Sequence, residues 1–209
     1  PVLRIDETAD GVRVETEVGV LHARHVVVSA GVWTPRLLPE LAPHTVVKPV
    51  ALTWFAPDRP ADFAPEVFPG FIRDHGDVHL FGVPTLDGSL VKAGYDARFG
   101  DVASPEALER RLDLAARDRI AADVHRLVPA LPASISRHSV HADLYTADKR
   151  AIIGRIRERV TVGTGYSGHG FKLTPAFGEA MADSALDRTP RLDLARFRPE
   201  RLGLAAVAA

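Results

Sequence analysis

The stretch that decides the fold is Val160–Ala180, VTVGTGYSGHGFKLTPAFGEA, in which a β-like run leads through a glycine-rich turn into a helix-like run. Gly163, Gly165 and Gly168 spell G-x-G-x-x-G, the local pattern of a dinucleotide-binding turn. That motif works inside a βαβ unit, with an acidic ribose ligand about 20 residues further on. Here only one helix-like run and a short tail follow, so the pattern alone does not predict a pyrophosphate site.

The serine in this turn also suggests the nucleophile elbow of a serine hydrolase, which requires G-x-S-x-G between a strand and a helix. Within residues 165–169 the last glycine of that pattern is replaced by His169. No histidine follows it along the chain to complete a triad. The residues therefore do not support an elbow.

A third interpretation is a glycine-lined floor that carries one cation, Lys172. Glycines at 168 and 170 let the backbone lie close to a flat ligand, with its N–H groups facing inward. Thr174 and Pro175 predict a helix start, and the amino end of a helix attracts anions. Lys172 is thus predicted either to bind an anionic group such as a carboxylate or to be a surface lysine beside a turn.

Histidines elsewhere raise the question of a metal. His75, Asp77 and His79, or His138 and His141, are of the right residue types. The first set lies across a predicted turn, and the second is spaced i,i+3 in a predicted strand, which places its members on opposite faces. Neither set predicts a metal site.

The bulk composition excludes several classes of protein. The 209 residues have a formal net charge of −1, so no overall field attracts nucleic acid or an anionic membrane. There is no cysteine, hence no disulfide, thiolate metal site or cofactor tethered through sulfur. No apolar run approaches the roughly 18 residues of a membrane span. No signal peptide is visible, so we expect a cytoplasmic protein, and we expect its true amino terminus to lie upstream of Pro1.

The rest of the chain predicts β-rich ends around a middle of strands and one helix. Asp10 and Gly11 predict a hairpin turn within the first 30 residues. Val26–Val28 is apolar at consecutive positions, as in a parallel strand covered on both faces. A second hairpin is predicted to turn at residues 75–77. Further strands are predicted within residues 45–58, 88–100, 135–154 and 159–165.

One long helix is predicted in the middle of the chain. Ser104 is a capping residue, and Pro105 suits the first helical position. Apolar residues then recur at three- and four-residue spacing until Pro129, which predicts one buried face. This face comprises Leu108, Leu112, Ala116, Ile120, Val124 and Leu127.

Four segments together resemble the D-amino-acid-oxidase-like flavoproteins, in the branch of monomeric sarcosine oxidase and N-methyl-L-tryptophan oxidase. They occur in the family's order, from about residue 1 to residue 190. The segments are ARHVVVSAGVWTPRLL (23–38), LFGVPTLDGSLVKAGYD (80–96), DLYTADKRAIIG (143–154) and GTGYSGHGFKLTPAFGEAMADSAL (163–186).

The resemblance implies an α/β flavoprotein with an α+β substrate part. Residues 1–47 and 143–190 would form part of a Rossmann-like FAD-binding domain, residues 48–142 a mixed-sheet substrate-binding domain, and residues 191–209 a tail. The implied reaction oxidises an amine or N-methyl amino acid to an imine, with oxygen reoxidising the flavin. The family's amino-terminal FAD-binding half, with its own G-x-G-x-x-G turn and a substrate-binding arginine, is absent here and is expected on the same or a separate chain.

The resemblance also implies roles for single residues. Lys172 would pair with the substrate carboxylate and Lys92 would help oxygen accept electrons, since a fixed cation stabilises both kinds of negative charge. Phe81 and Tyr166 would contact the substrate together with Lys172. The FAD contacts would be Ser29, Ala30, Gly31, Trp33, Gly168, His169, Gly170, Phe171 and Lys172.

Three positions depart from the branch. Asp143 stands where the branch carries its flavin-tethering cysteine, so any FAD is expected to be bound noncovalently. Phe81 and Asp96 replace a tyrosine and a histidine of the sarcosine oxidases, which predicts a different pocket. Two alternatives stay open. One is a dehydrogenase with another electron acceptor, and the other is a non-catalytic remnant or subunit that associates through the apolar surface at Val26–Val28.

Overall fold

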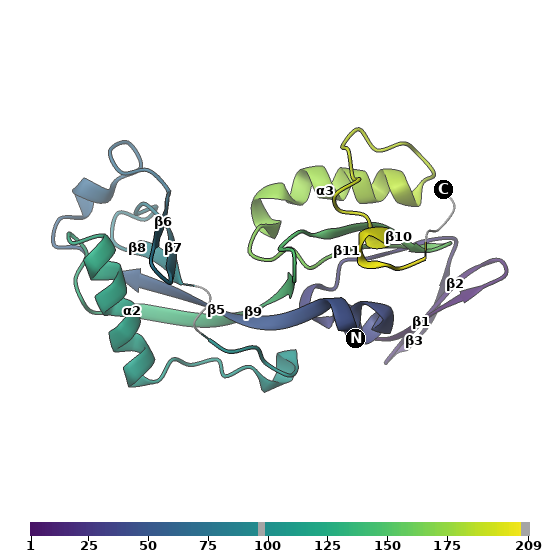
Figure 1. The fold of residues 1–209 in the computed structure, drawn as a ribbon, viewed down its shortest axis with the longest axis horizontal. Helices are drawn as coiled ribbons and strands as arrows, with labels where there is room; N and C mark the ends of the chain where they lie inside the picture. The colour runs from purple at the N-terminus through teal and green to yellow at the C-terminus, as the bar shows by residue number, and fades with distance from the viewer. Residues whose placement is uncertain (96–98, 206–209) are drawn as a thin grey trace. The chain divides into compact units, whose positions relative to one another are not determined.

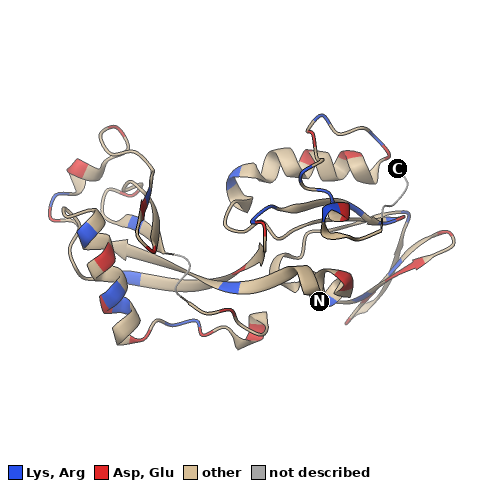
Figure 2. Ribbon diagram, in the orientation of Figure 1, with Lys and Arg blue, Asp and Glu red and all other residues tan. Residues whose placement is uncertain are grey.

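The computed structural model describes residues 1–95 and 99–205, in which helices and sheets are mixed along the chain (Figure 1). The expected α/β class is confirmed. The chain divides into two compact units, one formed by Pro1–Val47 and Asp143–Ala209 and the other by Lys48–Ala142. In the ribbon of Figure 2, acidic and basic residues are interspersed along both units. Within the described ranges, no helix is long and apolar enough to cross a membrane.

The discontinuous unit begins with an antiparallel meander of β1 (Val2–Thr8), β2 (Gly11–Thr16) and β3 (Gly19–Ala23). The predicted hairpin is confirmed, because β1 and β2 pair up to Thr8 and Gly11. A glycine is required at position 11 because there is no room for a side chain. A Cβ atom at Gly11 would overlap the carbonyl oxygen of Ala23 on β3.

The second sheet of this unit has the order β10-β11-β4, with β10 at Ile152–Arg157, β11 at Val160–Thr164 and β4 at Val26–Val28. β11 is antiparallel to β10 and parallel to β4, so the parallel pairing predicted from the valine run is confirmed. The prediction that Val26–Val28 is buried on both faces is wrong for one residue. Val28 is 4% exposed but Val27 is 41% exposed, because the two side chains point to opposite faces of the sheet and the face of Val27 is only partly covered.

Helix α3 (Gly170–Ala185) packs on β10 and β11 through Phe177 and Ala180 (Figure 1). The predicted start at Thr174 is wrong, because the glycine turn already provides the first helical residues. Thr174 Oγ1 donates to the carbonyl oxygen of Gly170 at 3.0 Å instead of capping the helix. Pro175 therefore lies inside the helix, where it lacks the N–H that would bond to the carbonyl of Phe171.

The five-stranded sheet of the other unit has the order β6-β7-β8-β5-β9. Its members are β6 (Phe71–His75), β7 (Val78–Val83), β8 (Val91–Tyr95), β5 (Thr45–Phe55) and β9 (Arg137–Thr146). β6 and β7 form the predicted hairpin, which turns at Gly76 with a positive φ of 61°. The boundaries between the units fall within β5 and β9.

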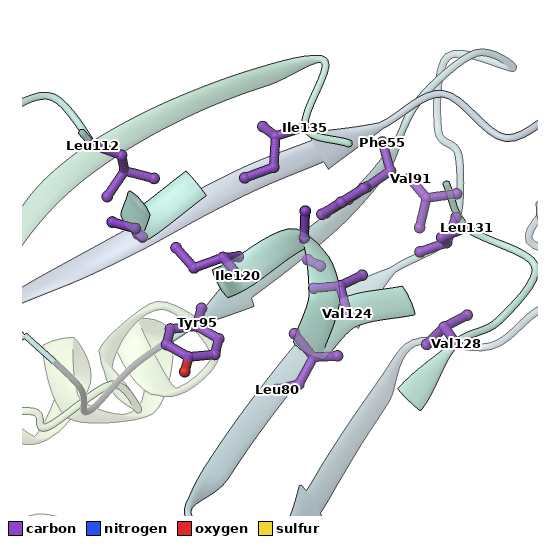
Figure 3. Close-up of a cluster of buried hydrophobic side chains, with 14 of the residues drawn as sticks. Phe55, Leu80, Val91, Tyr95, Leu112, Ile120, Val124, Val128, Leu131 and Ile135 are labelled. Atoms are coloured by element: carbon purple, nitrogen blue, oxygen red, sulfur yellow. The ribbon is translucent and has the colours of Figure 1, made fainter. Parts of the chain in front are cut away.

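One face of this sheet forms the core against helix α2 (Leu114–Leu127). Alternate residues of each strand point to that face, as period-two alternation requires. Figure 3 shows Leu80, Val91 and Phe55 from three strands beside Ile120 and Val124 of α2. The opposite face is not covered by α2, and it carries the remaining half of the strand side chains.

Helix α2 begins later than the sequence predicts. Ser104 Oγ does accept a bond from the Ala107 amide at 3.3 Å, but the helical turn that it caps, η4, spans only Pro105–Ala107. The long helix starts at Leu114, where Asp113 Oδ1 accepts from the Ala116 amide at 2.7 Å. Leu108 and Leu112 are buried as expected, but from an extended segment.

Short helical turns connect the remaining elements. They are η1 (Gly31–Trp33), α1 (Thr34–Leu37), η2 (Pro39–His44), η3 (Pro60–Phe63) and η5 (Pro199–Leu202).

The carboxy-terminal tail is held to its unit by an ion pair. Arg201 donates from Nε to Asp148 Oδ2 at 2.9 Å and from Nη2 to Oδ1 at 3.2 Å. Arg201 keeps the pKa of Asp148 well below its ordinary value. A carboxyl whose pKa is lowered by folding contributes stability above its ordinary pKa and loses it as the pH falls towards the lowered value.

Asp148→Asn is therefore expected to reduce the free energy of unfolding at neutral pH and to have little effect in strongly acidic solution. Urea denaturation at the two pH values measures this difference. Asp193→Asn is the matched control, because Asp193 accepts only a local amide bond, from Ala195. An equal loss at both pH values would show that the charge of Asp148 is not the cause.

Candidate cofactor and substrate site

Two segments far apart in the sequence lie at one edge of the β10-β11-β4 sheet. Residues 29–33 follow β4 and residues 165–172 follow β11, and these two strands are parallel, so their carboxyl ends lie together. Thr164, the last residue of β11, donates from Oγ1 to the carbonyl oxygen of Gly31 at 3.2 Å and lies 3.1 Å from the hydroxyl of Thr34. The carboxyl edge of parallel strands is where open α/β sheets bind their ligands.

The first segment is an open turn. Gly31 has a φ of 56°, so its backbone conformation favours glycine, and a Cβ atom there would meet nothing within 4 Å. Trp33 is 49% exposed, whereas the neighbouring Val32 is buried in the unit. The structure thus provides free space beside Gly31 and an accessible indole ring close to it in the chain.

The second segment, the loop of residues 165–170, is fastened to the end of β9. The Ser167 amide donates to the carbonyl oxygen of Leu144 at 3.1 Å, and the Thr146 amide donates to Ser167 Oγ at 3.1 Å. The Gly168 amide donates to Asp143 Oδ2 at 2.6 Å. The His169 amide donates to the carbonyl oxygen of Tyr166 at 2.9 Å. The expectation that the amides of Gly168–Gly170 face a ligand is therefore wrong for Gly168 and His169, whose N–H groups bond within the protein.

The Tyr166 ring packs inside the same region. A Cβ atom at Gly170 would lie 3.1 Å from this ring, and the ring centroids of Tyr166 and Phe177 are 6.0 Å apart. Burial raises the pKa of the Tyr166 phenol. Its packing supports the loop and the start of α3, and a contact between Tyr166 and a substrate stays a prediction.

The amino end of α3 is the part of the loop that is open to a ligand. His169 precedes the helix and provides no side-chain cap to its first amides. Lys172, in the first turn, is exposed, and its Nζ lies 3.1 Å from Nδ1 of His169. Phe171 is 99% exposed. A positive helix end, an ammonium group and an apolar ring thus occur together, which suits an anionic group attached to an apolar ligand.

Asp143 is the residue whose structural role sequence reasoning missed. Its Oδ1 accepts from the Leu144 amide at 2.8 Å, in addition to the bond between Oδ2 and Gly168. Burial raises the pKa of the Asp143 carboxyl, while the two amide bonds and the charge of His169 act in the opposite direction. No local sequence signal marks this contact, since Gly168 lies 25 residues further along the chain.

Lys92 belongs to the other unit, Lys48–Ala142. On β8 it lies opposite Trp54 of β5 and Val83 of β7, on the sheet face that α2 does not cover. The Phe81 ring lies over Gly94 on the same face, since a Cβ atom at Gly94 would overlap the ring. The Trp54 ring also has the guanidinium of Arg137 over it, 4.0 Å from its centroid. Asp96, the other position noted in this segment, lies outside the described residues.

Three of the four histidines considered as metal ligands have other partners. His79 Nδ1 lies 2.5 Å from Asp74 Oδ1, and His138 Nε2 is 3.4 Å from the Leu112 amide. His141 Nε2 is 2.9 Å from the Ser139 hydroxyl. Across residues 1–95 and 99–205, no three His, Cys, Asp or Glu side chains are grouped so as to hold a metal ion.

Comparison with known protein families decides which proteins this chain is related to. The model of the family "FAD dependent oxidoreductase" (DAO) matches residues 1–184. The chain belongs to the FAD-dependent oxidoreductase family. The resemblance to this family stated from the four segments is thereby confirmed.

Relatives in this family include a monomeric sarcosine oxidase from Streptomyces avermitilis, 33% identical over 98% of this chain and 55% of the relative. An N-methyl-L-tryptophan oxidase from Salmonella typhi is 34% identical over 96% of this chain and 54% of the relative. The chain thus spans about half the length of these relatives.

Solved structures share the fold at lower identity. NikD, an unusual amino acid oxidase, superposes with a TM-score of 0.76 at 22% identity, over 95% of this chain and 53% of NikD. An L-proline dehydrogenase from P. horikoshii superposes with a TM-score of 0.79 at 18% identity, over all of this chain and 55% of that protein. These similarities establish the fold of the chain.

Proposed function

We propose that this chain is the part of an FAD-dependent amine or amino-acid oxidase that seats the flavin ring and binds the substrate. The observation that carries the proposal is the hydrogen bond between Thr164 and Gly31, which joins the two glycine turns at one sheet edge. Sarcosine and N-methyl-L-tryptophan, which appear in the names of the two relatives above, are both N-methyl amino acids. We therefore propose an N-methyl amino acid or a related amine as the substrate, oxidised to an imine.

The residues at this edge fit the ring end of FAD. The open space at Gly31 admits a flat ring, and Trp33 and Phe171 offer apolar surface that excludes water. When bound, the flavin supplies the acceptor for the hydride equivalent that leaves the amine. Ser29–Gly31, together with Gly168–Gly170, would form the floor on which the ring lies.

Lys172 would hold the substrate carboxylate. Its ammonium stands at the amino end of α3, so the charge of the lysine and the partial positive charge of the helix end act on the same anion. Binding the carboxylate fixes the position of the amine relative to the floor, and orientation of this kind contributes directly to the rate.

Lys92 would serve the reaction with oxygen. Trp54 and Val83 are its neighbours on the adjacent strands, and a fixed cation stabilises the negative charge that develops on oxygen. Phe81, on the same face, would contact the substrate side chain.

The ADP part of FAD would be bound by a further unit, on the same or a separate polypeptide. β4 lies at the edge of its sheet, and the exposed Val27 there is suited to contact with another strand or chain. Combining the chain with that unit tests the function. The expected result is a yellow protein that forms peroxide from N-methyl amino acids, and a colourless protein would overturn the proposal.

FAD is expected to be bound noncovalently, because the carboxylate of Asp143 cannot form the thioether that a cysteine at this position forms in the branch. Acid precipitation of the yellow protein is therefore expected to leave all the flavin in the supernatant. The absorbance of the pellet and the supernatant measures this. Flavin that stays with the pellet would contradict noncovalent binding.

A further inference from the structure

The Asp143 carboxylate holds two backbone amides that belong to different elements. Oδ1 accepts from the Leu144 amide within β9, at 2.8 Å. Oδ2 accepts from the Gly168 amide in the loop, at 2.6 Å. Bonds from backbone amides to a carboxylate are stronger than those between neutral groups. The carboxylate therefore joins the end of β9 to the loop that precedes α3.

The loop needs such support because its conformation is unfavourable. Ser167 has a φ of 51° and Gly168 a φ of 83°, and the first of these is unfavourable for a residue with a side chain. The bonds between Ser167 and the residues Leu144 and Thr146 hold one side of the loop. The bond from Gly168 to Asp143 holds the side next to α3.

His169 and Lys172 lead from the held loop towards the site. His169 follows Gly168 directly, and its Nδ1 lies 3.1 Å from Lys172 Nζ. Because an ammonium group can only donate, Nδ1 is the acceptor when these two groups bond. Gly168, His169 and Lys172 thus form a row that leads away from the Asp143 contact. The row ends at the ammonium group that would receive the substrate carboxylate.

We propose that Asp143 is a positioning residue, which fixes the loop through the Gly168 amide so that Lys172 and the amino end of α3 are correctly placed. This inference rests on the proposed function, because the placement of Lys172 matters for catalysis only if Lys172 binds the substrate carboxylate. The resemblance places the branch's flavin-tethering cysteine at this position, and here Asp143 instead joins the loop to β9.

Asp143→Asn tests the contact, because it replaces the charged carboxylate by a neutral amide with a single acceptor oxygen, so the bond from the Gly168 amide is either weakened or lost. The Gly168 amide proton of the ¹⁵N-labelled 209-residue chain is expected to move upfield in the NMR spectrum of the variant and to exchange faster with solvent. Asp193→Asn is the control, since Asp193 also accepts a backbone amide, that of Ala195. An unchanged Gly168 signal in Asp143→Asn would overturn the contact.

The consequence is tested in the protein combined with its FAD-binding unit. Asp143→Asn is expected to raise KM for an N-methyl amino acid roughly tenfold, as one lost bond to a charged group implies, and to change kcat much less. A changed Gly168 signal with an unchanged KM would overturn the positioning role. Failure of the proposed function is distinguishable, because it appears as absence of flavin in the unsubstituted protein, whereas the NMR result does not depend on flavin.

Discussion

Lys92→Met is expected to slow the reoxidation of reduced flavin by oxygen about 100- to 1,000-fold, because it removes a fixed positive charge from where negative charge develops on oxygen. Methionine keeps the unbranched shape of lysine, so the packing against Trp54 and Val83 is retained. Anaerobic reduction of the flavin by the substrate is expected to be nearly unchanged. Stopped-flow absorbance of the flavin measures the two half-reactions separately.

Lys48→Met is the matched control for this experiment. Lys48 lies on β5 of the same unit, between the buried residues Val47 and Pro49, and its ammonium is 3.4 Å from Asp101. Its replacement removes the same charge elsewhere on the sheet and is expected to leave reoxidation unaffected. If Lys92→Met also leaves reoxidation unaffected, Lys92 does not serve oxygen, and a dehydrogenase that uses another acceptor becomes the better interpretation.

Lys172→Met is expected to raise KM for an N-methyl amino acid roughly 10- to 100-fold, because a hydrogen bond between two charged groups is lost. The same substitution is expected to have little effect on an amine that has no carboxylate. The ratio of kcat/KM for the two substrates therefore isolates the contact. Steady-state peroxide formation with both substrates measures it.

Lys149→Met provides the control, since Lys149 is an exposed lysine of the same unit in the turn between β9 and β10. A similar rise of KM for both substrates would show that Lys172 acts on the structure of the site and not on the carboxylate. No rise for either substrate would remove Lys172 from the site.

Most of the strands could be predicted because their signals are local. Gly76 marks its hairpin through the positive φ that the turn requires, and the valines at 26–28 predict a parallel strand from their own sequence. The cover of that strand could not be predicted in the same way. Whether Val27 is buried depends on what packs on its face of the sheet, and this is not encoded in the run itself.

Both helix starts were misplaced for one physical reason. A cap residue followed by proline indicates that a turn can begin, but not how far the helix extends. At Ser104 the turn ends after three residues, and at Thr174 the helix had already begun at Gly170. Burial of Leu108 and Leu112 was predicted correctly because apolar spacing reports burial even where the backbone is extended.

The candidate site was predictable in its residue types and not in its internal bonds. The glycines, Lys172 and the open turn at Gly31 are visible in the sequence because they are spelled by consecutive residues. The partners of the loop amides are Asp143 and Leu144, on a strand more than 20 residues earlier. Such pairings depend on how the elements pack, so only the structure provides them.

Two aromatic rings of the five-stranded sheet lie flat over glycines, one on each face. Phe71 covers Gly82 on the side of the core, and Phe81 covers Gly94 on the opposite side. A single methyl group at either glycine would displace the ring above it. The contour of the surface around Lys92 is therefore governed by a position that has no side chain, and a lineage that exchanges Gly94 reshapes its pocket without altering any aromatic residue.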